Sequence, residues 1–211
     1  MPLTMPLTMA LKTPLRWTAC ALLTIAALPV AAAQASFEYC TVCHGANGNG
    51  NIAIRAPKIS GIEPWYLKSQ FAAFKAGWRG AHPEDAPGNE MRPVAMALSD
   101  AEVDRALAYV ASFSPRAPAI TVNGDASRGK ALYGACGACH GAAGQGNQSL
   151  HAPALAGRTD WYLVTQLHNY RAGLRGADAA DSSGQQMRAM AATLADDAAV
   201  NDVVAYIDTL R

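Results

Sequence analysis

The sequence has few charged residues and almost no net charge. Of its 211 residues, 16% are charged, and the formal net charge at pH 7 is +1. This balance gives no argument for binding nucleic acid or another polyanion. The sequence also lacks alternating runs of β-branched residues, which would predict strands. These absences favour an all-α protein and exclude the classes that depend on a strongly basic surface.

Long hydrophobic runs are absent as well. The longest, Trp17 to Val30, has about 14 residues, fewer than the ~20 that a membrane-spanning helix needs. It follows Lys12 and Arg16 and precedes an A-x-A site at 31–33 or 33–35, which is the pattern of a secretory signal. We therefore expect residues 1–35 to be a signal peptide, cleaved near Ala33–Ala35 on export to the periplasm. An uncleaved segment that serves as a membrane anchor is the alternative.

Cysteine is scarce, and its placement is informative. Apart from Cys20 in the signal segment, the cysteines form two C-x-x-C-H motifs, Cys40–His44 and Cys136–His140. This motif is the attachment signature of c-type haem, in which two thiols bind the vinyl groups and the histidine can bind the iron. Two motifs predict two covalently bound haem c groups, attached through Cys40 and Cys43 and through Cys136 and Cys139.

Three other uses of paired cysteines fit less well. A thioredoxin-like dithiol follows a strand in a βαβ pattern, and none is predicted here. The pairs of a structural zinc site usually lie closer along the chain and need no adjacent histidine. A disulfide within each pair is the remaining alternative for an exported protein.

The motifs are part of an internal duplication with an offset of 96 residues. The matches include Pro57 with Pro153, Trp65–Leu67 with Trp161–Leu163, Arg79 with Arg175, and Met91 with Met187. We predict two domains of one kind, at residues 36–113 and 124–211. Two prolines in residues 114–123 indicate a semi-rigid linker between them.

Local signals predict helices in both copies. Pro64 opens a helix that Gly77 closes, and Ser99 with Glu102 forms a capping box before another. The second copy predicts the corresponding helices over residues 161–173 and 196–210, and a further helix over 125–133. Cleavage near residue 33 would leave the first copy only a short or frayed N-terminal helix, so we expect the haem at His44 to be the more exposed one.

Each iron needs two axial ligands, and the repeat supplies candidates for both. His44 and His140 follow the attachment cysteines directly, and Met91 and Met187 lie in register. Ligation by His and Met favours Fe(II) and raises the reduction potential. Met96 and Met190 are nearby rivals, but neither has a methionine at the matching position.

Two prolines are candidates for a supporting role. The carbonyl of Pro57 or Pro153, each 13 residues after the haem histidine, can accept the Nδ1–H of that ligand and fix its tautomer. A simple turn proline is the alternative.

Several other residues are expected around or away from the haems. The expected haem walls are Trp65, Leu67, Phe71, Tyr109, Trp161, Leu163, Leu167 and Tyr206. Four arginines, Arg79, Arg92, Arg175 and Arg188, can pair with the haem propionates or lie in solvent. We expect His82, His151 and His168, which have no histidine counterparts, at the surface.

With these motifs in both copies, the chain resembles dihaem cytochromes of the c4 type, built from two class I cytochrome c folds in tandem. The resemblance implies covalent haem at the four cysteines, His and Met as axial ligands, and proline carbonyls that bind the histidines. It also implies periplasmic transfer of single electrons between redox protein partners, towards a terminal oxidase or another respiratory complex. Peripheral association with the membrane is compatible with this function.

Two further functions remain open. One is a dihaem redox enzyme, such as a peroxidase or a sulfur-compound oxidising cytochrome. The paired methionines argue against the open iron position that such an enzyme needs, and no extra cysteine is left as a special ligand. The other is a membrane-anchored cytochrome subunit of an oxidase complex.

Overall fold

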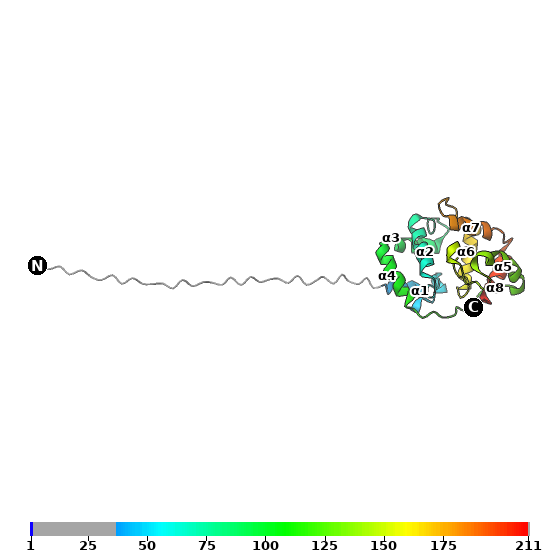
Figure 1. Ribbon diagram of the computed structural model, residues 1–211, viewed down its shortest axis with the longest axis horizontal. Helices are drawn as coiled ribbons and strands as arrows, with labels where there is room; N and C mark the ends of the chain where they lie inside the picture. Colours follow the sequence, from blue (N-terminus) through cyan, green and yellow to red (C-terminus); the bar gives the residue numbers. More distant parts are fainter. Residues whose placement is uncertain (2–36, 211) are drawn as a thin grey trace. The chain divides into compact units, whose positions relative to one another are not determined.

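The computed structural model describes Met1 and residues 37–210, so the predicted signal segment lies outside the described residues except for Met1. The helices are α1 (Tyr39–His44), α2 (Pro64–Ala76), α3 (Ala86–Ala97), α4 (Asp100–Ala111), α5 (Ala126–His140), α6 (Asp160–Arg171), α7 (Ser182–Ala191) and α8 (Asp197–Asp208). Short 3₁₀ turns are η1 (Ala46–Gly48), η2 (Ile52–Ile54) and η3 (Gln148–Leu150). Helices α1–α4 gather on one side of the folded body and α5–α8 on the other (Figure 1).

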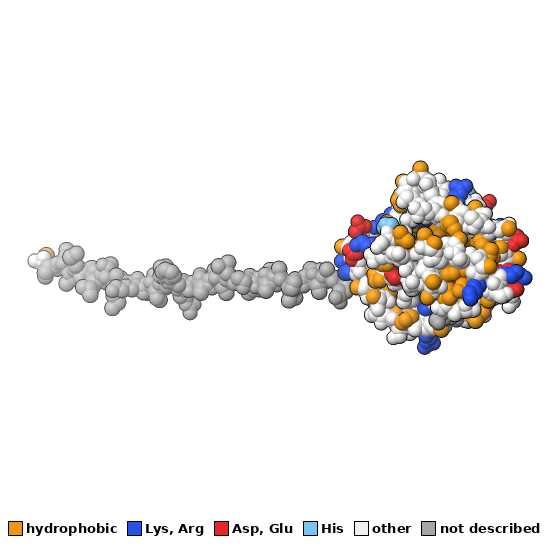
Figure 2. Space-filling model, turned by 45° about the vertical axis from the view of Figure 1, so that its right-hand side comes forward, with side chains coloured by type: hydrophobic (Ala, Val, Ile, Leu, Met, Phe, Trp, Pro, Cys, Tyr) orange, Lys and Arg blue, Asp and Glu red, His pale blue; other side chains and the backbone are white. Residues whose placement is uncertain are grey.

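No strand occurs in residues 37–210, where extended pairing is limited to isolated bridges between Asn51 and Ala56 and between Asn147 and Ala152. The all-α prediction is confirmed. None of the described helices is long and apolar enough to cross a membrane. On the face drawn in Figure 2, hydrophobic side chains occupy much of the middle, and many charged ones lie nearer the edge.

The predicted start and stop signals act as expected. Helix α2 begins at Pro64 and ends before Gly77, which has a positive φ of 80°. Helix α4 begins after Ser99, whose hydroxyl accepts from the Glu102 N–H while the Glu102 carboxylate accepts from the Ser99 N–H. These contacts satisfy amide groups that a helix end leaves unpaired.

Helices α3 and α7, which carry Met91 and Met187, were not predicted. Glycine and proline are poor helix formers, and α3 contains Pro87, Gly88 and Pro93. Each helix begins with an aspartate N-cap instead. Asp85 accepts from the Gly88 N–H at 3.3 Å, and Asp181 accepts from the Gly184 N–H at 2.9 Å. The paired aspartates were the available signal for these helices.

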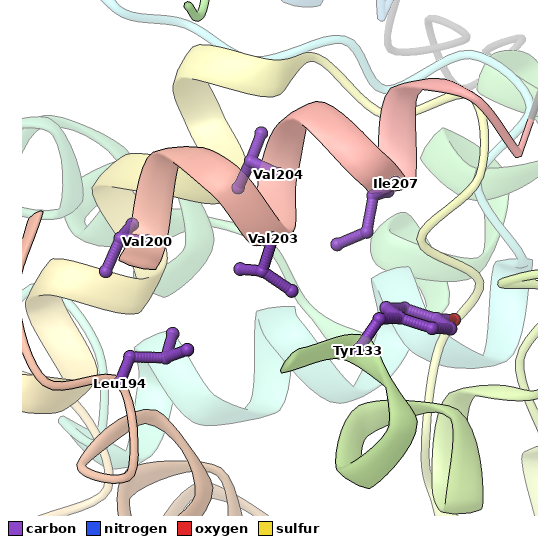
Figure 3. Packing of buried hydrophobic residues seen from close by; sticks show 6 residues of the cluster. All are labelled: Tyr133, Leu194, Val200, Val203, Val204 and Ile207. Carbon is purple, nitrogen blue, oxygen red and sulfur yellow. The ribbon is translucent and has the colours of Figure 1, made fainter. Parts of the chain in front are cut away.

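The second half is built around the packing of α5 against α8. Helix α5 is longer than the predicted 125–133 and continues through the second C-x-x-C-H motif. Its Tyr133 packs against one face of α8, as Figure 3 shows. The cluster comprises Tyr133, Leu194, Val200, Val203, Val204 and Ile207. The Tyr133 hydroxyl donates to the Gly141 carbonyl at 2.7 Å, which ties this core to the loop after His140.

The first half has only the six-residue α1 where the second has α5, within the described residues. Phe37, which matches Tyr133 in the repeat, is buried just before α1. A buried aromatic residue is therefore kept at this position while the long helix is not. This agrees with the expected short helix and leaves His44 half-buried, whereas His140 is buried.

The end of the linker is fastened to α6 by a buried carboxylate. Asp160 is fully buried and accepts from the N–H and hydroxyl of Thr121 and from the N–H groups of Val122 and Trp161. The matching residue in the first half is Pro64, so this contact has no counterpart there. Burial raises the pKa of Asp160, but these hydrogen bonds outweigh it and leave the pKa below its usual value.

Replacing Asp160 by asparagine should destabilise the protein by about 2 kcal/mol near pH 7, because the carboxylate binds several N–H groups. A lowered folded-state pKa stabilises the fold above the pKa of the unfolded chain, about 4, and this contribution is lost as the pH falls through the folded value. The difference between wild type and Asp160→Asn in urea unfolding should therefore shrink below about pH 4. An equal difference at pH 7 and pH 3 would contradict this account.

Candidate haem sites

The ligand histidines are held in the same way in both halves. His44 Nδ1 lies 2.7 Å from the Pro57 carbonyl oxygen, and His140 Nδ1 lies 2.7 Å from that of Pro153. A carbonyl only accepts, so Nδ1 carries the hydrogen and Nε2 keeps a free lone pair for a metal. The expected proline contact is thus present at both sites.

Glycines make the approach of each proline loop possible. The N–H groups of Gly50 and Gly146 donate to the carbonyls of His44 and His140, each at 2.7 Å. Both glycines have positive φ values, 90° and 79°, and a Cβ at either one would press on the backbone of the proline loop. Glycine is required there because a side chain would push the proline carbonyl away from the histidine.

Burial disfavours the charged form of both imidazoles. Burial lowers the pKa of His44, although the bond to Pro57 acts in the opposite direction. Burial also lowers the pKa of His140, against the opposing effects of Pro153 and of the Glu63 carboxylate. Neutral imidazole is the form that binds a metal, so the lowered pKa of both side chains favours their use as ligands.

None of the four motif cysteines forms a disulfide. Cys43 and Cys139 are exposed, whereas Cys40 and Cys136 are half-buried, and burial raises the pKa of both half-buried thiols. The disulfide alternative is not formed in this structure. In residues 37–210, no cluster of three or more His, Cys, Asp or Glu side chains could hold a metal ion, which disfavours the zinc alternative.

A cavity of about 250 Å³ brings the first set of predicted site residues together. Its lining includes Cys40, Cys43, His44, Pro57 and Met91. Met96, on the same helix as Met91, is 56% exposed and does not line it. The structure therefore favours Met91 over Met96 at this site.

At the second site, burial does not distinguish the two candidate methionine ligands. Met187 and Met190 both lie on α7, and both are half-buried. Register with Met91 remains the argument for Met187.

The expected haem walls are present in part. Leu67 and Phe71 line the cavity at His44, but Trp65 lies in a separate groove on the outside of α2 and α4, and Tyr109 packs edge-on against Phe113 with ring centres 4.9 Å apart. These two do not line the cavity, contrary to expectation. In the second half, the predicted Leu163, Leu167 and Tyr206 pack against the α5–α8 core. Trp161 and Leu163 also line the first cavity.

Arg79 and Arg175 are buried, so a solvated surface role is wrong for both. Their guanidinium groups stack on the rings of Phe74 and Tyr170, each at 4.4 Å. Arg79 also donates to Gln70 at 2.8 Å and to Tyr162 of the other half at 3.1 Å. Both arginines are close to where the two halves meet.

The Nε atoms of these two arginines are buried without a hydrogen-bond partner among the described residues. A buried donor left unpaired is costly, and a cationic one fits a carboxylate. The pair therefore suits the propionates of two haem groups. By contrast, Arg92 donates to the Phe74 carbonyl at 3.3 Å, and Arg188 is exposed.

The unmatched histidines lie at or near the surface. His82 and His151 are exposed, and the His168 side chain is 39% exposed, 3.7 Å from Asp197. None of them lines the cavity that contains His44.

Sequence reasoning missed the contacts between the halves. Glu63 pairs with Arg158, Lys58 donates to the Gly157 carbonyl at 3.1 Å, and Asn169 donates to Asp85 at 3.2 Å. The signal was available where the repeat breaks, since Glu63 aligns with Thr159 and Arg158 aligns with Ile62.

Comparisons with known proteins agree with this geometry. The cytochrome c family model matches twice, over residues 30–114 and 126–211. The thiosulfate dehydrogenase electron acceptor of Stutzerimonas stutzeri is 36% identical, over 72% of this chain and 71% of its own. Cytochrome c4 of Thiocapsa roseopersicina is 35% identical, over 74% of this chain and 80% of its own.

A solved structure shows the same arrangement. Reduced recombinant cytochrome c4 from Pseudomonas stutzeri superposes with a TM-score of 0.66 and 30% identity, over 84% of this chain and 96% of that one. The duplicated motifs, the helical fold and these matches lead to one conclusion. The chain belongs to the cytochrome c family, as a c4-like dihaem electron-transfer protein with two tandem cytochrome c domains and two covalently bound haem c groups.

Proposed function

We propose that the protein is a periplasmic carrier of single electrons rather than an enzyme, with both irons six-coordinate. In this proposal Cys40, Cys43, Cys136 and Cys139 attach the haems, His44 and Met91 bind the first iron, and His140 and Met187 bind the second. Pro57 and Pro153 orient the histidines. The observation that carries it is the cavity at the first site, where Met91 and His44 share one lining. A filled sixth position leaves no place for a substrate.

The proposed acceptor is a terminal oxidase or another respiratory complex. The similarity to a protein named as an electron acceptor of thiosulfate dehydrogenase supports a second candidate, in which that enzyme is the donor. The two candidates are compatible because one protein can receive electrons from one partner and pass them to another. The pattern of residues 1–35 supports a periplasmic location.

Reconstitution tests this proposal. The purified dihaem protein should be reduced by a thiosulfate dehydrogenase with thiosulfate and reoxidised by membranes that contain a terminal oxidase. Peroxide or thiosulfate supplied without a partner should give no turnover. Steady turnover of either substrate by the protein alone would contradict the carrier function.

The surface around the first attachment site favours docking there. Tyr39, Val42, Ile52 and Ile54 are exposed by 43%, 76%, 55% and 46%. At the matching positions the second half has Ala135, Ala138, Gln148 and Leu150, and only Leu150 is a large exposed hydrophobic residue. Redox partners form small interfaces whose apolar centre contributes most of the affinity. We infer that partners dock at the first haem.

Val42→Glu should slow reduction by a partner, on the order of tenfold, because a charge would be desolvated at the centre of that interface and 1.4 kcal/mol corresponds to tenfold. Ala138→Glu, at the matching position of the second half, is the control and should change the rate by less than about twofold. Stopped-flow measurement of the second-order rate constant compares the two. Equal slowing by both variants, or slowing by Ala138→Glu alone, would overturn docking at the first haem.

A further inference from the structure

The peptide group between Pro153 and Ala154 is hydrogen-bonded at both ends, to the ligand histidine at one end and to a carboxylate at the other. The carbonyl oxygen of Pro153 accepts from His140 Nδ1 at 2.7 Å. The N–H of the same peptide group, which belongs to Ala154, donates to Glu63 Oε1 at 2.8 Å. Hydrogen bonds in a chain polarise one another. A carboxylate at the N–H end therefore makes the carbonyl oxygen more negative and a stronger acceptor for His140.

The carboxylate comes from the other half of the molecule. Glu63 occupies the N-cap position of α2, but its side chain makes no capping bond there and extends across the boundary instead. Its Oε2 pairs with Arg158, whose Nε donates to the Ala154 carbonyl at 2.9 Å. The side chains of Arg158 and Glu63 are only 9% and 27% exposed, so water screens these charges weakly.

The first half has no matching arrangement. Glu63 aligns with Thr159 and Arg158 aligns with Ile62, neither of which carries a charge. Thr159 is buried, and its hydroxyl has no hydrogen-bond partner in the part of the chain that the structure describes. The contact from histidine to proline carbonyl is thus common to both sites. The residue that matches Glu63 is a threonine and brings no carboxylate to the first site.

We propose that Glu63 is a positioning residue that lowers the reduction potential of the second haem through the Pro153–Ala154 peptide. A stronger bond from Nδ1–H to the carbonyl gives the imidazole of His140 more anionic character, which favours Fe(III) over Fe(II). The first domain in this way adjusts the second haem, and Arg158 limits the effect by its opposite charge. The inference rests on the proposed ligation of iron by His140.

Two substitutions separate this role from simple docking of the halves. Glu63→Gln keeps an acceptor for the Ala154 N–H but removes the negative charge and leaves Arg158 without its counter-charge. It should favour reduction of the second haem about tenfold, which is 59 mV for one electron. Arg158→Ile introduces the residue found at the matching position in the first half and leaves Glu63 without its counter-charge. It should shift the same equilibrium severalfold in the opposite direction.

The measurement is a redox titration of the full dihaem protein, followed by NMR of the haem methyl groups so that each haem has its own potential. The first haem should shift less than half as much as the second in both variants. Glu63→Asp serves as a gentler variant, because it keeps the charge but draws it away from the Ala154 N–H. It should shift the second haem in the same direction as Glu63→Gln, by a smaller amount.

The outcomes distinguish the possibilities. Opposite shifts at the second haem support the proposal. Shifts of the same sign in Glu63→Gln and Arg158→Ile, or equal shifts of both haems, would mean that the ion pair only joins the halves and would overturn it. Loss of about half of the low-spin absorption in His140→Ala, the share of the second haem, is a separate test of ligation. Retention of the full low-spin absorption would refute the ligand assignment rather than the role of Glu63.

Discussion

Met91→Ala should halve the weak far-red absorption band that marks sulfur ligation of Fe(III), and it should lower the potential of the first haem. Met91 lines the same cavity as His44, Cys40 and Cys43, which supports the proposed ligation of one iron by Met91 and His44. A thioether favours Fe(II) over Fe(III), and its loss removes that preference. Absorption spectra of the oxidised protein measure the first effect, and a redox titration measures the second.

Met96→Ala is the matched control, because Met96 lies on the same helix and is 56% exposed. It should leave the band and both potentials unchanged. At the second site, Met187→Ala should remove the other half of the band, and Met190→Ala should not. If Met190→Ala removed it instead, the register argument would be wrong for the second site while the geometry at the first site would still stand.

The sequence contained most of the information on the individual sites. The C-x-x-C-H motif specifies its chemistry within five residues, and the repeat predicted that Pro57 and Pro153 would meet their histidines. These contacts are short-range in sequence, 13 residues apart in each copy, and each copy repeats the same glycine loop. A local pattern that occurs twice supports a prediction more strongly, because both copies must satisfy the same local geometry.

The helices that carry Met91 and Met187 were harder to predict from the sequence. Intrinsic propensity argues against a helix over residues 86–97, which contain two prolines and a glycine. A Cβ at Gly88 or Gly184 would collide with the carboxylate of the aspartate N-cap, which accounts for glycine within these helices. A Cβ at Gly80 or Gly176 would in turn collide with the backbone of Gly88 or Gly184. Tertiary packing outweighs propensity in such a segment.

Contacts between the halves were harder to predict, because the departures from the repeat mark candidate residues without pairing them. Glu63 and Arg158 differ from their counterparts, and a duplication says nothing about how its copies face one another. Arg79 and Arg175 are the instructive exception. These two arginines match across the repeat. The sequence allowed either a contact with the haem propionates or a solvated position, and their burial excludes the solvated position. The presence of an arginine at this position in both copies is consistent with a pseudo-symmetric arrangement, in which each buried guanidinium group faces the other half.

Gly129→Ala should destabilise the protein by about 2–3 kcal/mol, because it adds a methyl group where α5 lies directly against the backbone of α8. A Cβ at Gly129 would collide with the backbone carbonyl of Asp202 on α8. The two helices would have to separate, and the packing of Tyr133 against Val203 and its neighbours would loosen. Urea unfolding followed by far-UV circular dichroism measures the change.

Gly134, on the same helix, supplies a control of opposite sign. A Cβ there would meet nothing within 4 Å, and the residue is exposed. Gly134→Ala should therefore stabilise the protein by about 0.5–1 kcal/mol, through the lower backbone entropy of the unfolded chain. Destabilisation by both variants would mean that α5 tolerates no change near the haem motif for reasons other than its contact with α8. Opposite signs would identify the crossing at Gly129 as the contact that allows the C-x-x-C-H helix to sit against the C-terminal helix.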